Sequence, residues 1–430
     1  MEKPLNIAIA GLGTIGGGTL KIIRENASLL KERSGREIRL VAVLDRDRKK
    51  LERLKLEGVA FVESPKVLAA MPEVDVIVEL MGGAEGAAKE LVESALKAGK
   101  HVVTANKALI AHHGVALAKL AEKSGKVLAY EAAVAGGIPI IKSLREGLAA
   151  NHFSKIAGIL NGTCNFILTS MKQEHKDFGE ALKEAQQRGF AEADPSFDID
   201  GVDTAHKLAI LTSLAYGVQP DIDAVYVEGI RNITIPDIEF ADQLGFIIKL
   251  LGISQRVESK ILQRVHPCMV GKDTALGRVS GAYNGIIVEG SSVGRITFEG
   301  RGAGEGPTAS AVVADIMDIA RGAYYRPFTI AAEHLKKAQF SDMDSLRTSY
   351  YLRLSVADKP GVLAAITGVF SKEGISVDSF LQHPPKSGET AQVVITTHET
   401  VELHMRHAIK SIAALDSVTE PPHMIRMENL

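Results

Sequence analysis

The first 130 residues alternate short apolar runs with longer stretches in which apolar positions recur at helical spacing. Short, nearly continuous apolar runs are typical of parallel strands buried on both faces, and helical spacing is typical of the helices that cover such strands. The runs lie at residues 5–10, 38–44, 59–62, 74–80, 101–107 and 127–130. This alternation predicts an α/β fold built on a doubly wound parallel sheet of the Rossmann type.

A glycine motif, GLGTIG, separates the first apolar run from the first helical stretch. Glycines between a strand and a helix allow the backbone to approach a pyrophosphate group at the helix N-terminus. A merely tight turn is the alternative, but the order of strand, glycines and helix favours a dinucleotide site. The expected contacts are Gly11, Gly13, Thr14, Ile15 and Gly16.

The second apolar run ends in an acidic and a basic residue, Asp45 and Arg46. An acidic residue at this position normally binds the ribose hydroxyl groups of NAD, whereas an arginine accommodates the additional phosphate of NADP. Both are present here, so these residues leave the choice between NAD and NADP open.

Polar residues follow the fifth apolar run, among them Thr104 and Lys107. Ligands of doubly wound sheets bind beyond the C-terminal ends of the strands. We therefore expect Thr104 to contact the cofactor and Lys107 to project towards its nicotinamide end, with a solvent-exposed loop lysine as the alternative. Gly304, in a second glycine-rich turn that leads into a helix, is expected to return to the same site, unless this turn is only a capping hinge.

Residues 189–207 form an acidic stretch, GFAEADPSFDIDGVDTAHK. It places Glu192 and several aspartates in a loop interrupted by proline and glycine, and a strongly apolar helical pattern begins after Asp203. In a helix that starts there, Asp203 and Lys207 lie one turn apart on the same face. An ordinary solvated ion pair is the alternative, but the apolar helix that follows favours the wall of a pocket.

The pattern changes after residue 130. The small residues at 132–137, with Glu131, offer oxygen ligands for a hard cation, although a tight crossover loop is the favoured interpretation of these residues alone. Alternating runs after Ile261 predict a mixed or antiparallel sheet. We expect an α+β domain for substrate binding, catalysis and dimerisation at residues 131–304. Cys164 has no convincing histidine partner, so a buried cysteine is favoured over a catalytic thiol.

Residues 350–427 read as strand, helix, two strands, helix and strand. This βαββαβ order is the ferredoxin-like arrangement of a small independent domain. The chain therefore divides into a nucleotide-binding domain at residues 1–130, the central domain, and a C-terminal domain at residues 349–430. Residues 305–335 are expected to pack back on the first domain.

Composition excludes several classes of protein. The 430 residues contain 50 lysines and arginines against 52 aspartates and glutamates, so neither nucleic acid nor an anionic membrane is expected as a partner. Cys164 and Cys268 lack the spacing of a disulfide scaffold or a zinc cluster. No apolar run approaches the roughly 20 residues of a membrane helix, and no signal-peptide pattern precedes the first strand. We expect a soluble cytoplasmic protein.

Together the motifs resemble homoserine dehydrogenase with a C-terminal ACT regulatory domain. The resemblance covers residues 5–427 and rests on GLGTIG, TANK at 104–107, EAAVAGGIPI at 131–140, LNGTCNF at 160–166 and, above all, GFAEADPS followed by DIDGVDTAHK. It implies the NAD- or NADP-dependent interconversion of L-homoserine and L-aspartate 4-semialdehyde, in the biosynthesis of threonine, methionine and isoleucine from aspartate. It also implies feedback inhibition by L-threonine and a homodimer or homotetramer.

The resemblance assigns roles to the charged residues. Lys207 becomes the proton-transferring lysine, and Lys107 becomes a second lysine that contacts cofactor and substrate. Glu192 and Asp203 become the carboxylates that hold the substrate. The chemistry suits these residue types, because hydride transfer to an aldehyde carbon leaves negative charge on its oxygen, which an ammonium group stabilises and protonates.

The resemblance extends to the cofactor and to a metal ion. Gly189 and Gly304 join the expected cofactor contacts. Asp45 departs from the family pattern, which has a neutral apolar residue before the arginine, and this argues against a strict NADP preference. A monovalent cation, usually sodium, is implied at Glu131 and the backbone of Val134, Gly136 and Ile138.

Two other classes are compatible with parts of the chain. One is an aldehyde-oxidising dehydrogenase that forms a thioester on Cys164. The other is a nucleotide- and amino-acid-sensing protein without catalysis. The dense acidic and basic cluster at residues 192–207 argues against the sensor, because a sensor needs no proton donor.

Overall fold

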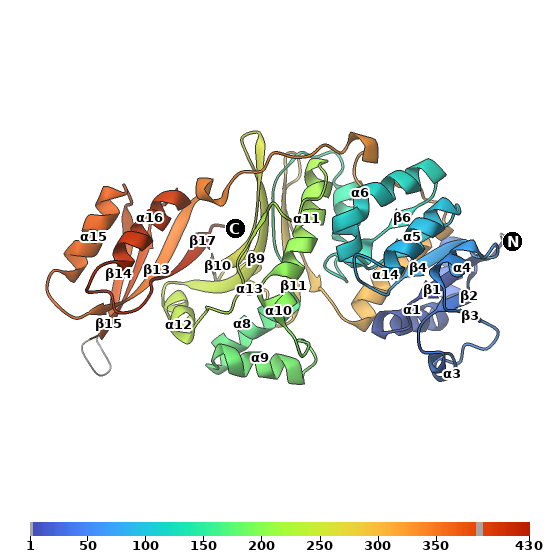
Figure 1. The fold of residues 1–430 in the computed structure, drawn as a ribbon, viewed down its shortest axis with the longest axis horizontal. Helices are drawn as coiled ribbons and strands as arrows, with labels where there is room; N and C mark the ends of the chain where they lie inside the picture. Colours follow the sequence, from blue (N-terminus) through green and yellow to red (C-terminus); the bar gives the residue numbers. More distant parts are fainter. Residues whose placement is uncertain (1–2, 384–389) are drawn as a thin grey trace.

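A computed structural model describes residues 3–383 and 390–430 of the chain. An N-terminal α/β domain lies at one end of an elongated molecule, an α+β domain lies in the middle, and the C-terminal unit forms the other end (Figure 1). No helix within the described ranges combines the length and the apolar character needed to cross a bilayer. The three parts follow one another in chain order, except that residues 305–320 return to the first.

The N-terminal domain contains a parallel sheet in the order β3-β2-β1-β4-β5-β6. This is the doubly wound Rossmann order, which confirms the prediction from the apolar runs. The strands are β1 (Leu5–Ala10), β2 (Ile38–Leu44), β3 (Ala60–Val62), β4 (Val76–Glu79), β5 (His101–Thr104) and β6 (Leu128–Ala129). The helices are α1 (Thr14–Glu25), α2 (Ala27–Ser34), α3 (Lys49–Arg53), α4 (Pro65–Ala70), α5 (Ala87–Lys97) and α6 (Lys107–Ser124).

Two boundaries in this domain differ from expectation. The strand expected at residues 101–107 ends at Thr104, because the side chain of Asn106 caps α6 by accepting a hydrogen bond from a backbone N–H three residues on. Lys107 is therefore the first residue of a helix and not the last residue of a strand. The helical stretch after the glycine motif consists of two helices that meet at Asn26.

Helix α14 (Glu305–Ala320) lies in the N-terminal domain, although it follows the central domain in sequence. It packs against α1 so closely that a side chain at Gly18 would lie 2.5 Å from Glu305 Cγ. Its buried Val312 and Ile316 belong to the apolar core that β1 and β4 also line. The second glycine-rich turn thus leads into a helix that covers the parallel sheet.

The central domain is built on a mixed sheet in the order β12-β11-β7-β9-β10-β17-β13-β15-β14, in which β8 also pairs with β10. Its strands are β7 (Phe153–Ile159), β8 (Val225–Val227), β9 (Phe246–Val257), β10 (Lys260–Gly271), β11 (Tyr283–Gly290) and β12 (Gly294–Arg301). Its helices are η1 (Glu131–Ala133), α7 (Ile140–Lys142), η2 (Ser143–Gly147), α8 (Gly162–Glu174), α9 (Phe178–Gln187), α10 (Ser196–Ile199), α11 (Val202–Tyr216), α12 (Ile235–Gln243) and α13 (Ala275–Arg278). The mixed sheet expected after Ile261 is confirmed.

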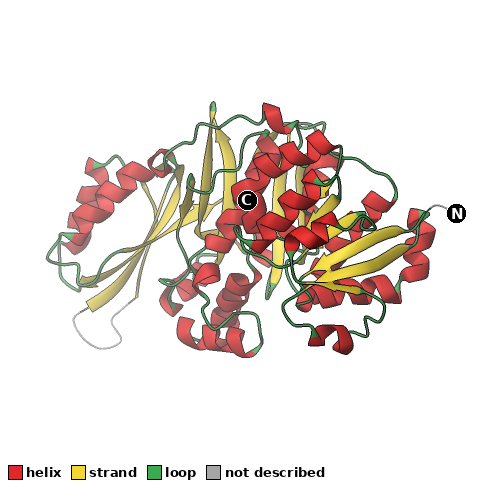
Figure 2. Ribbon diagram, turned by 45° about the vertical axis from the view of Figure 1, so that its right-hand side comes forward, coloured by secondary structure: helices red, strands yellow, loops and turns green. Residues whose placement is uncertain are grey.

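The C-terminal unit has the predicted βαββαβ order, and its sheet runs β17-β13-β15-β14. Its helices lie together on one face of its strands (Figure 2). The elements are β13 (Arg347–Ala357), α15 (Val362–Lys372), β14 (Val377–His383), β15 (Thr390–Thr397), β16 (Thr400–Val401), α16 (Glu402–Ala413) and β17 (His423–Glu428). Two short helices, η3 (Ala332–His334) and η4 (Met343–Ser345), lie in the connection from α14.

The C-terminal unit has an apolar core of its own, but it is joined to the central domain more closely than the sequence predicts. Strand β17 pairs in parallel with β10, with Cys268 opposite Arg426, so the two sheets are continuous. Tyr351 and Ile425 are buried in the core of the central domain. The sequence pattern of a strand describes its faces, whereas pairing at its edge depends on which strand the fold places beside it.

Buried ion pairs hold this junction. Arg264 on β10 contacts Glu428 on β17 at 2.6 Å, and neither side chain is more than 5% exposed. Arg426, also on β17, contacts Glu402 of α16 at 2.5 Å and Glu228 at 2.9 Å. Removal of one partner from such a pair leaves an uncompensated buried charge, which costs far more stability than the loss of an exposed pair.

We expect Glu428→Gln to lower the free energy of unfolding by about 3 kcal/mol, because Arg264 then remains buried without a carboxylate. Glu289→Gln is the matched control: it breaks the more exposed pair with Arg295 on β12 and should cost less than about 1 kcal/mol. Urea denaturation at neutral pH measures both changes. Equal stability of the two variants would contradict the structural role of Glu428.

In acid, Glu428→Gln should no longer lower the free energy of unfolding. Burial by itself raises the pKa of Glu428, but the charges of Arg264 and Lys155 lower it to about 2. A carboxylate with a lowered pKa stabilises the protein fully above its unfolded value of about 4.3, and this contribution is lost as the pH falls towards 2. The stability difference between Glu428→Gln and the parent should therefore shrink over that range.

Candidate active site

Helix α11 begins where the acidic loop ends, as the sequence predicts. Gly201 caps it in the left-handed conformation (φ 86°), and a side chain at this position would approach Val227 and Val265 to 3.1 Å. The absence of a side chain at Gly201 thus allows the loop to lie directly on β8 and β10. Asp203 follows in the first helical turn, and Lys207 lies one turn further on.

The carboxylate of Asp203 lies between two ammonium groups. Lys207 Nζ is 2.7 Å from Asp203 Oδ2, and Lys107 Nζ is 2.8 Å from Oδ1. Lys207 belongs to the same helix, whereas Lys107 comes from the first turn of α6 in the N-terminal domain. The Asp203 side chain is 4% exposed and that of Lys107 is 32% exposed. The fold therefore brings the three predicted residues together in a cluster that opens to solvent on the Lys107 side.

Two residues of the LNGTCNF stretch complete the cluster. The carbonyl oxygen of Leu160 accepts a hydrogen bond from Lys207 Nζ at 2.7 Å. The side-chain amide of Asn161 donates to Asp203 Oδ2 at 2.8 Å and to Asp198 Oδ1 at 2.7 Å, while its carbonyl caps α8. An asparagine between an apolar run and a helical stretch is a recognisable capping signal. Its contact with the acidic loop, however, could not be predicted from the sequence.

The two aspartates of the cluster differ in their electrostatic environment. Burial by itself raises the pKa of Asp203, but the ammonium groups of Lys207 and Lys107 lower it well below its ordinary value. Burial and the charge of Asp203 raise the pKa of Asp198, which the hydrogen bond from Asn161 partly offsets. Asp203 is therefore a stable anion between two cations.

Cys164 lacks the environment of a nucleophile. It is 0% exposed, and its thiol donates to the carbonyl oxygen of Asp198 at 3.3 Å. Burial and the carboxylates of Asp198 and Asp203 raise the pKa of the thiol well above its ordinary value. Reactive cysteines need a lowered pKa and access to solvent, so this geometry disfavours a thioester-forming enzyme.

Two neighbouring cavities lie at the C-terminal edge of the parallel sheet, and residues 80–82 of the loop after β4 line both. The larger has a volume of 820 Å³ and the smaller a volume of 490 Å³. Predicted site residues line both cavities: Gly11, Gly13, Asp45 and Arg46 line the larger, and Ile15, Lys107, Glu192, Lys207 and Gly304 line the smaller. The glycine motif and the lysine cluster thus face adjoining spaces.

The glycine motif forms one edge of the larger cavity. Gly11 has a φ of 94°, and a side chain on it would lie 2.7 Å from the carbonyl oxygen of Leu80. A side chain on Gly16 would lie 2.1 Å from the carbonyl oxygen of Gly11. Thr14 is the first residue of α1. The motif therefore presents the N-terminus of α1 to the cavity, which is the arrangement that binds phosphate groups.

Asp45 is turned towards the glycine motif. Its carboxylate accepts a hydrogen bond from the backbone N–H of Leu12 at 2.7 Å and lies 2.9 Å from Lys50 Nζ. Burial by itself raises the pKa of Asp45, but hydrogen bonds from the Asp47 backbone and from Lys50 lower it below its ordinary value. Lys50, which no sequence motif singled out, joins Arg46 as a cation at the larger cavity.

Thr104 and Gly189, both expected at the cofactor, lie outside the lining of the two cavities. Thr104 is 0% exposed, and its hydroxyl donates to Glu79 at 2.6 Å beneath the loop. Gly189 lies on the surface, just beyond the end of α9. Cofactor contact by Thr104 and by Gly189 therefore stays a prediction: residues 105–107, directly after Thr104, line the smaller cavity, and so does Glu192, shortly after Gly189.

Glu192 faces the smaller cavity. It is exposed, and in the described part of the chain no lysine, arginine or histidine forms an ion pair with it. Its carboxylate is therefore free to accept hydrogen bonds from a cationic ligand in the cavity.

Glu131 is the first residue of the short helix η1, at the crossover where its residues predict a tight loop. It is 2% exposed, and its carboxylate accepts hydrogen bonds from two backbone N–H groups at the start of α7, at 2.9 and 2.8 Å. A side chain on Gly136 would lie 2.6 Å from the carbonyl oxygen of Gly302. Burial and the neighbouring Asp315 raise the pKa of Glu131 to about 7. The carbonyl groups predicted to complete a cation site belong to the same loop, at Val134, Gly136 and Ile138.

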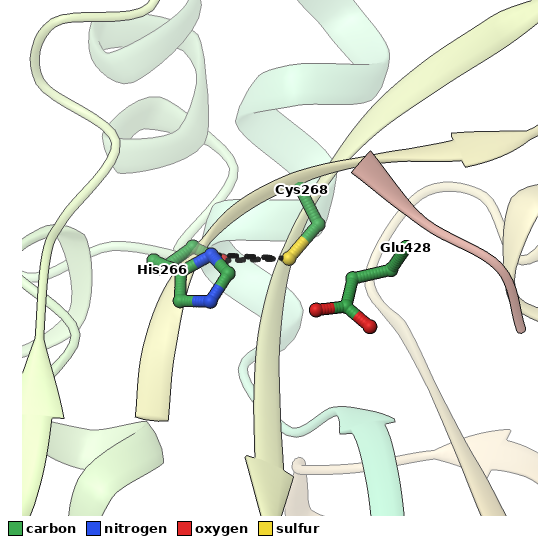
Figure 3. Close-up of side chains that lie close together, drawn as sticks. All are labelled: His266, Cys268 and Glu428. Atoms are coloured by element: carbon green, nitrogen blue, oxygen red, sulfur yellow. Dashed lines mark hydrogen bonds between the residues drawn. The ribbon is translucent and has the colours of Figure 1, made fainter. Parts of the chain in front are cut away.

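A second group of ligand-type side chains lies at the sheet junction, where His266, Cys268 and Glu428 approach one another (Figure 3). His266 Nδ1 is 3.2 Å from Cys268 Sγ. Such groups bind transition metals, but burial and the charges of Arg426 and Arg264 lower the pKa of His266 well below its ordinary value. Surroundings that disfavour a proton on His266 also disfavour a metal cation, so we assign these side chains to the ion-pair network.

Comparison with known proteins gives consistent matches over the whole chain. The sequence matches the family descriptions "Homoserine dehydrogenase, NAD binding domain" at residues 11–131, "Homoserine dehydrogenase" at residues 139–317 and "ACT domain" at residues 350–417. The homoserine dehydrogenase of Neisseria gonorrhoeae is 46% identical over 434 residues, which cover 100% of this chain and 99% of that protein.

Two solved structures are also similar. A homoserine dehydrogenase from Thiobacillus denitrificans has a TM-score of 0.93 at 44% identity, and the match covers 99% of both chains. A hyperthermophilic archaeal homoserine dehydrogenase in complex with NADPH has a TM-score of 0.65 at 29% identity, and the match covers 75% of this chain and 100% of that one.

Proposed function

The chain belongs to the homoserine dehydrogenase family of oxidoreductases, and on this premise we propose that it interconverts L-homoserine and L-aspartate 4-semialdehyde with NAD or NADP. The observation that carries the proposal is the position of Asp203 between Lys107 and Lys207 at the smaller cavity. That cavity adjoins the one formed by the glycine motif, so a substrate and a dinucleotide would meet at the two lysines.

Lys207 is the proposed proton donor and acceptor. When bound, the nicotinamide cofactor supplies or accepts the hydride. Lys207 Nζ donates two of its three N–H groups, to Asp203 and to the carbonyl of Leu160, each at 2.7 Å. The third can reach a substrate oxygen, where it stabilises developing negative charge and transfers the proton, worth about 10²–10⁴-fold in rate. In the oxidation of homoserine, neutral Lys207 accepts the hydroxyl proton.

The remaining charged groups suit an amino-acid substrate. The ammonium group of homoserine needs a carboxylate partner, and Glu192 offers an exposed one at the cavity. Lys107 is held by Asp203 yet is partly exposed, so it can contact both substrate and cofactor. Asp203 keeps the two lysines close enough to act on one substrate, because its charge offsets their mutual repulsion.

For the cofactor, we propose that both NAD and NADP are accepted. The adenosine end would lie in the larger cavity, where Arg46 and Lys50 offer cations to a 2′-phosphate and Asp45 offers a carboxylate to unphosphorylated ribose. The archaeal relative was solved in complex with NADPH, which supports a nicotinamide dinucleotide as the cofactor.

We expect Lys207→Ala to lower the turnover number at least about 10²-fold in both directions, because the proton donor is lost. The cofactor KM should change less than about threefold, since Lys207 is tied to Asp203 and Leu160 and not to the glycine motif. NAD(P)H absorbance with aspartate semialdehyde, and with homoserine, measures both. Lys183→Ala, on the exposed face of α9, is the control. Near-normal turnover of Lys207→Ala would exclude this role, and an inactive parent protein would overturn the proposed function.

We also propose that Glu131, with the carbonyl groups of Val134, Gly136 and Ile138, holds a monovalent cation such as sodium. Carboxylate and carbonyl oxygens are the donors that hard cations prefer. A bound cation would compensate the carboxylate of Glu131, whose pKa burial raises to about 7.

Binding of this cation should stabilise the folded protein and raise its melting temperature, Tm. Because the pKa of Glu131 is raised in the folded state, its ionisation costs stability, and without a cation the protein should become more stable as the pH falls through about 7. Sodium chloride should therefore raise the Tm above that in choline chloride at about pH 8, and the difference should fade in mild acid. Glu131→Gln should abolish the difference in Tm between the two salts. Equal Tm values in both salts would contradict the site.

We further propose that the enzyme acts in threonine, methionine and isoleucine biosynthesis, as a homodimer or homotetramer, and that L-threonine inhibits it through the ACT domain. Gly361 is the N-cap of α15 and has a φ of 90°, with open space around it. Free N–H groups at a helix N-terminus suit an amino-acid carboxylate. Deletion of the domain is not a clean test, because β17 is part of the catalytic sheet.

Gly361→Asp should relieve threonine inhibition and raise the threonine concentration for half-inhibition at least about tenfold, because it adds a carboxylate where the effector's own would lie. Gly361→Asn is the matched control: it has the same shape and tolerates the left-handed conformation comparably, but it lacks the charge. Initial rates over a threonine series measure both. Equal sensitivity of the two variants, or a parent enzyme that ignores millimolar threonine, would contradict the proposal.

A further inference from the structure

We infer that Glu79, at the end of β4, is a positioning residue for the dinucleotide cofactor. It is the charged residue of an otherwise aliphatic strand, VIVE, and it is 0% exposed. In the described part of the chain no cation forms an ion pair with it. A buried carboxylate without a cation is costly unless hydrogen-bond donors surround it. The donors that surround Glu79 therefore show what it holds.

Three donors converge on this carboxylate. Glu79 Oε1 accepts hydrogen bonds from the backbone N–H groups of Met81, at 2.7 Å, and Gly82, at 3.1 Å. Oε2 accepts from the hydroxyl of Thr104 at 2.6 Å. The loop after β4 is thus folded around the side chain of the residue that precedes it.

This loop separates the two cavities. Residues 80–82 line both, and the carbonyl of Leu80 packs against Gly11 of the glycine motif. Gly82 and Gly83 have φ values of 79° and 85°, and glycine backbones have wide conformational freedom. The loop therefore takes its course from the Glu79 carboxylate, and a dinucleotide that occupies both cavities must pass over it. In this respect the inference rests on the proposed function.

The same network reaches the start of α6. The Thr104 hydroxyl accepts a hydrogen bond from the backbone N–H of Asn106 at 3.0 Å. The Asn106 side chain donates to the carbonyl of Gly83 at 2.7 Å and caps α6, which begins with Lys107. Glu79 and Asn106 thus hold the two ends of one loop. The ammonium group of Lys107 is held separately by Asp203, so the loss of Glu79 should affect the cofactor before the substrate.

The test compares Glu79→Ala with Glu79→Gln in the full-length enzyme. The alanine variant leaves three donors unpaired, and it should raise the dissociation constants of NADPH and NADH at least about tenfold. Glutamine keeps an oxygen for Met81 and Gly82, and the Thr104 hydroxyl can turn to accept from its amide, so binding should stay within about threefold. Glu73→Ala, an exposed glutamate just before β4, is the control. Fluorescence titration without substrate gives the constants, and steady-state kinetics gives the KM values.

For Glu79→Ala we expect a raised dissociation constant for the cofactor, while the KM for homoserine stays within about threefold of the parent value. A variant that only folds poorly would lose maximal rate and leave both constants unchanged. Unchanged cofactor binding in Glu79→Ala, or an equal rise of both KM values, would overturn the inference. So would a glutamine variant as weak as the alanine variant, since the charge itself would then matter. A parent protein that binds neither cofactor would overturn the proposed function as well.

Discussion

The carboxylate of Asp203 connects the two domains that form the cavities. Its oxygens lie 2.7 and 2.8 Å from two ammonium groups, one on α11 of the central domain and one in the first turn of α6 of the N-terminal domain. Two lysines this close repel each other unless an anion lies between them, and a buried carboxylate is stable only with compensating charge. Each part of the cluster therefore depends on the others, and this shared carboxylate links the two domains whose residues line the smaller cavity.

The supports of this cluster come from several segments. Asn161 holds Asp203 and Asp198 from the end of β7, and Leu160 fixes Lys207 by its carbonyl. Beneath the neighbouring cavity, Glu79 plays a comparable part for the loop after β4. In both places a buried polar side chain provides hydrogen-bond partners for groups that would otherwise lack them: carboxylates in the case of Asn161, and backbone N–H groups in the case of Glu79.

The C-terminal unit is part of the same construction. Strand β17 extends the catalytic sheet beside β10, and Arg426 reaches Glu228 just after β8. Two residues further on, the N–H of Ile230 donates to the carbonyl of Ile199 in the acidic loop at 2.9 Å. The ACT domain is therefore packed, through β8 and β10, against the loop that leads to Asp203, and it is not a separate body joined by a linker.

Local patterns in the sequence determined much of the fold and part of the candidate active site. The apolar runs predicted the parallel sheet, the glycine motif predicted the turn into α1, and the spacing of Asp203 and Lys207 predicted an ion pair one helical turn apart. These signals depend on residues within a few positions of one another. The tertiary structure decided what depends on distant segments: Lys107 beside Asp203, Asn161 beside Asp198, Thr104 beside Glu79, and β17 beside β10. No local pattern encodes such contacts, because they form only when the fold brings separate strand ends and sheet edges together.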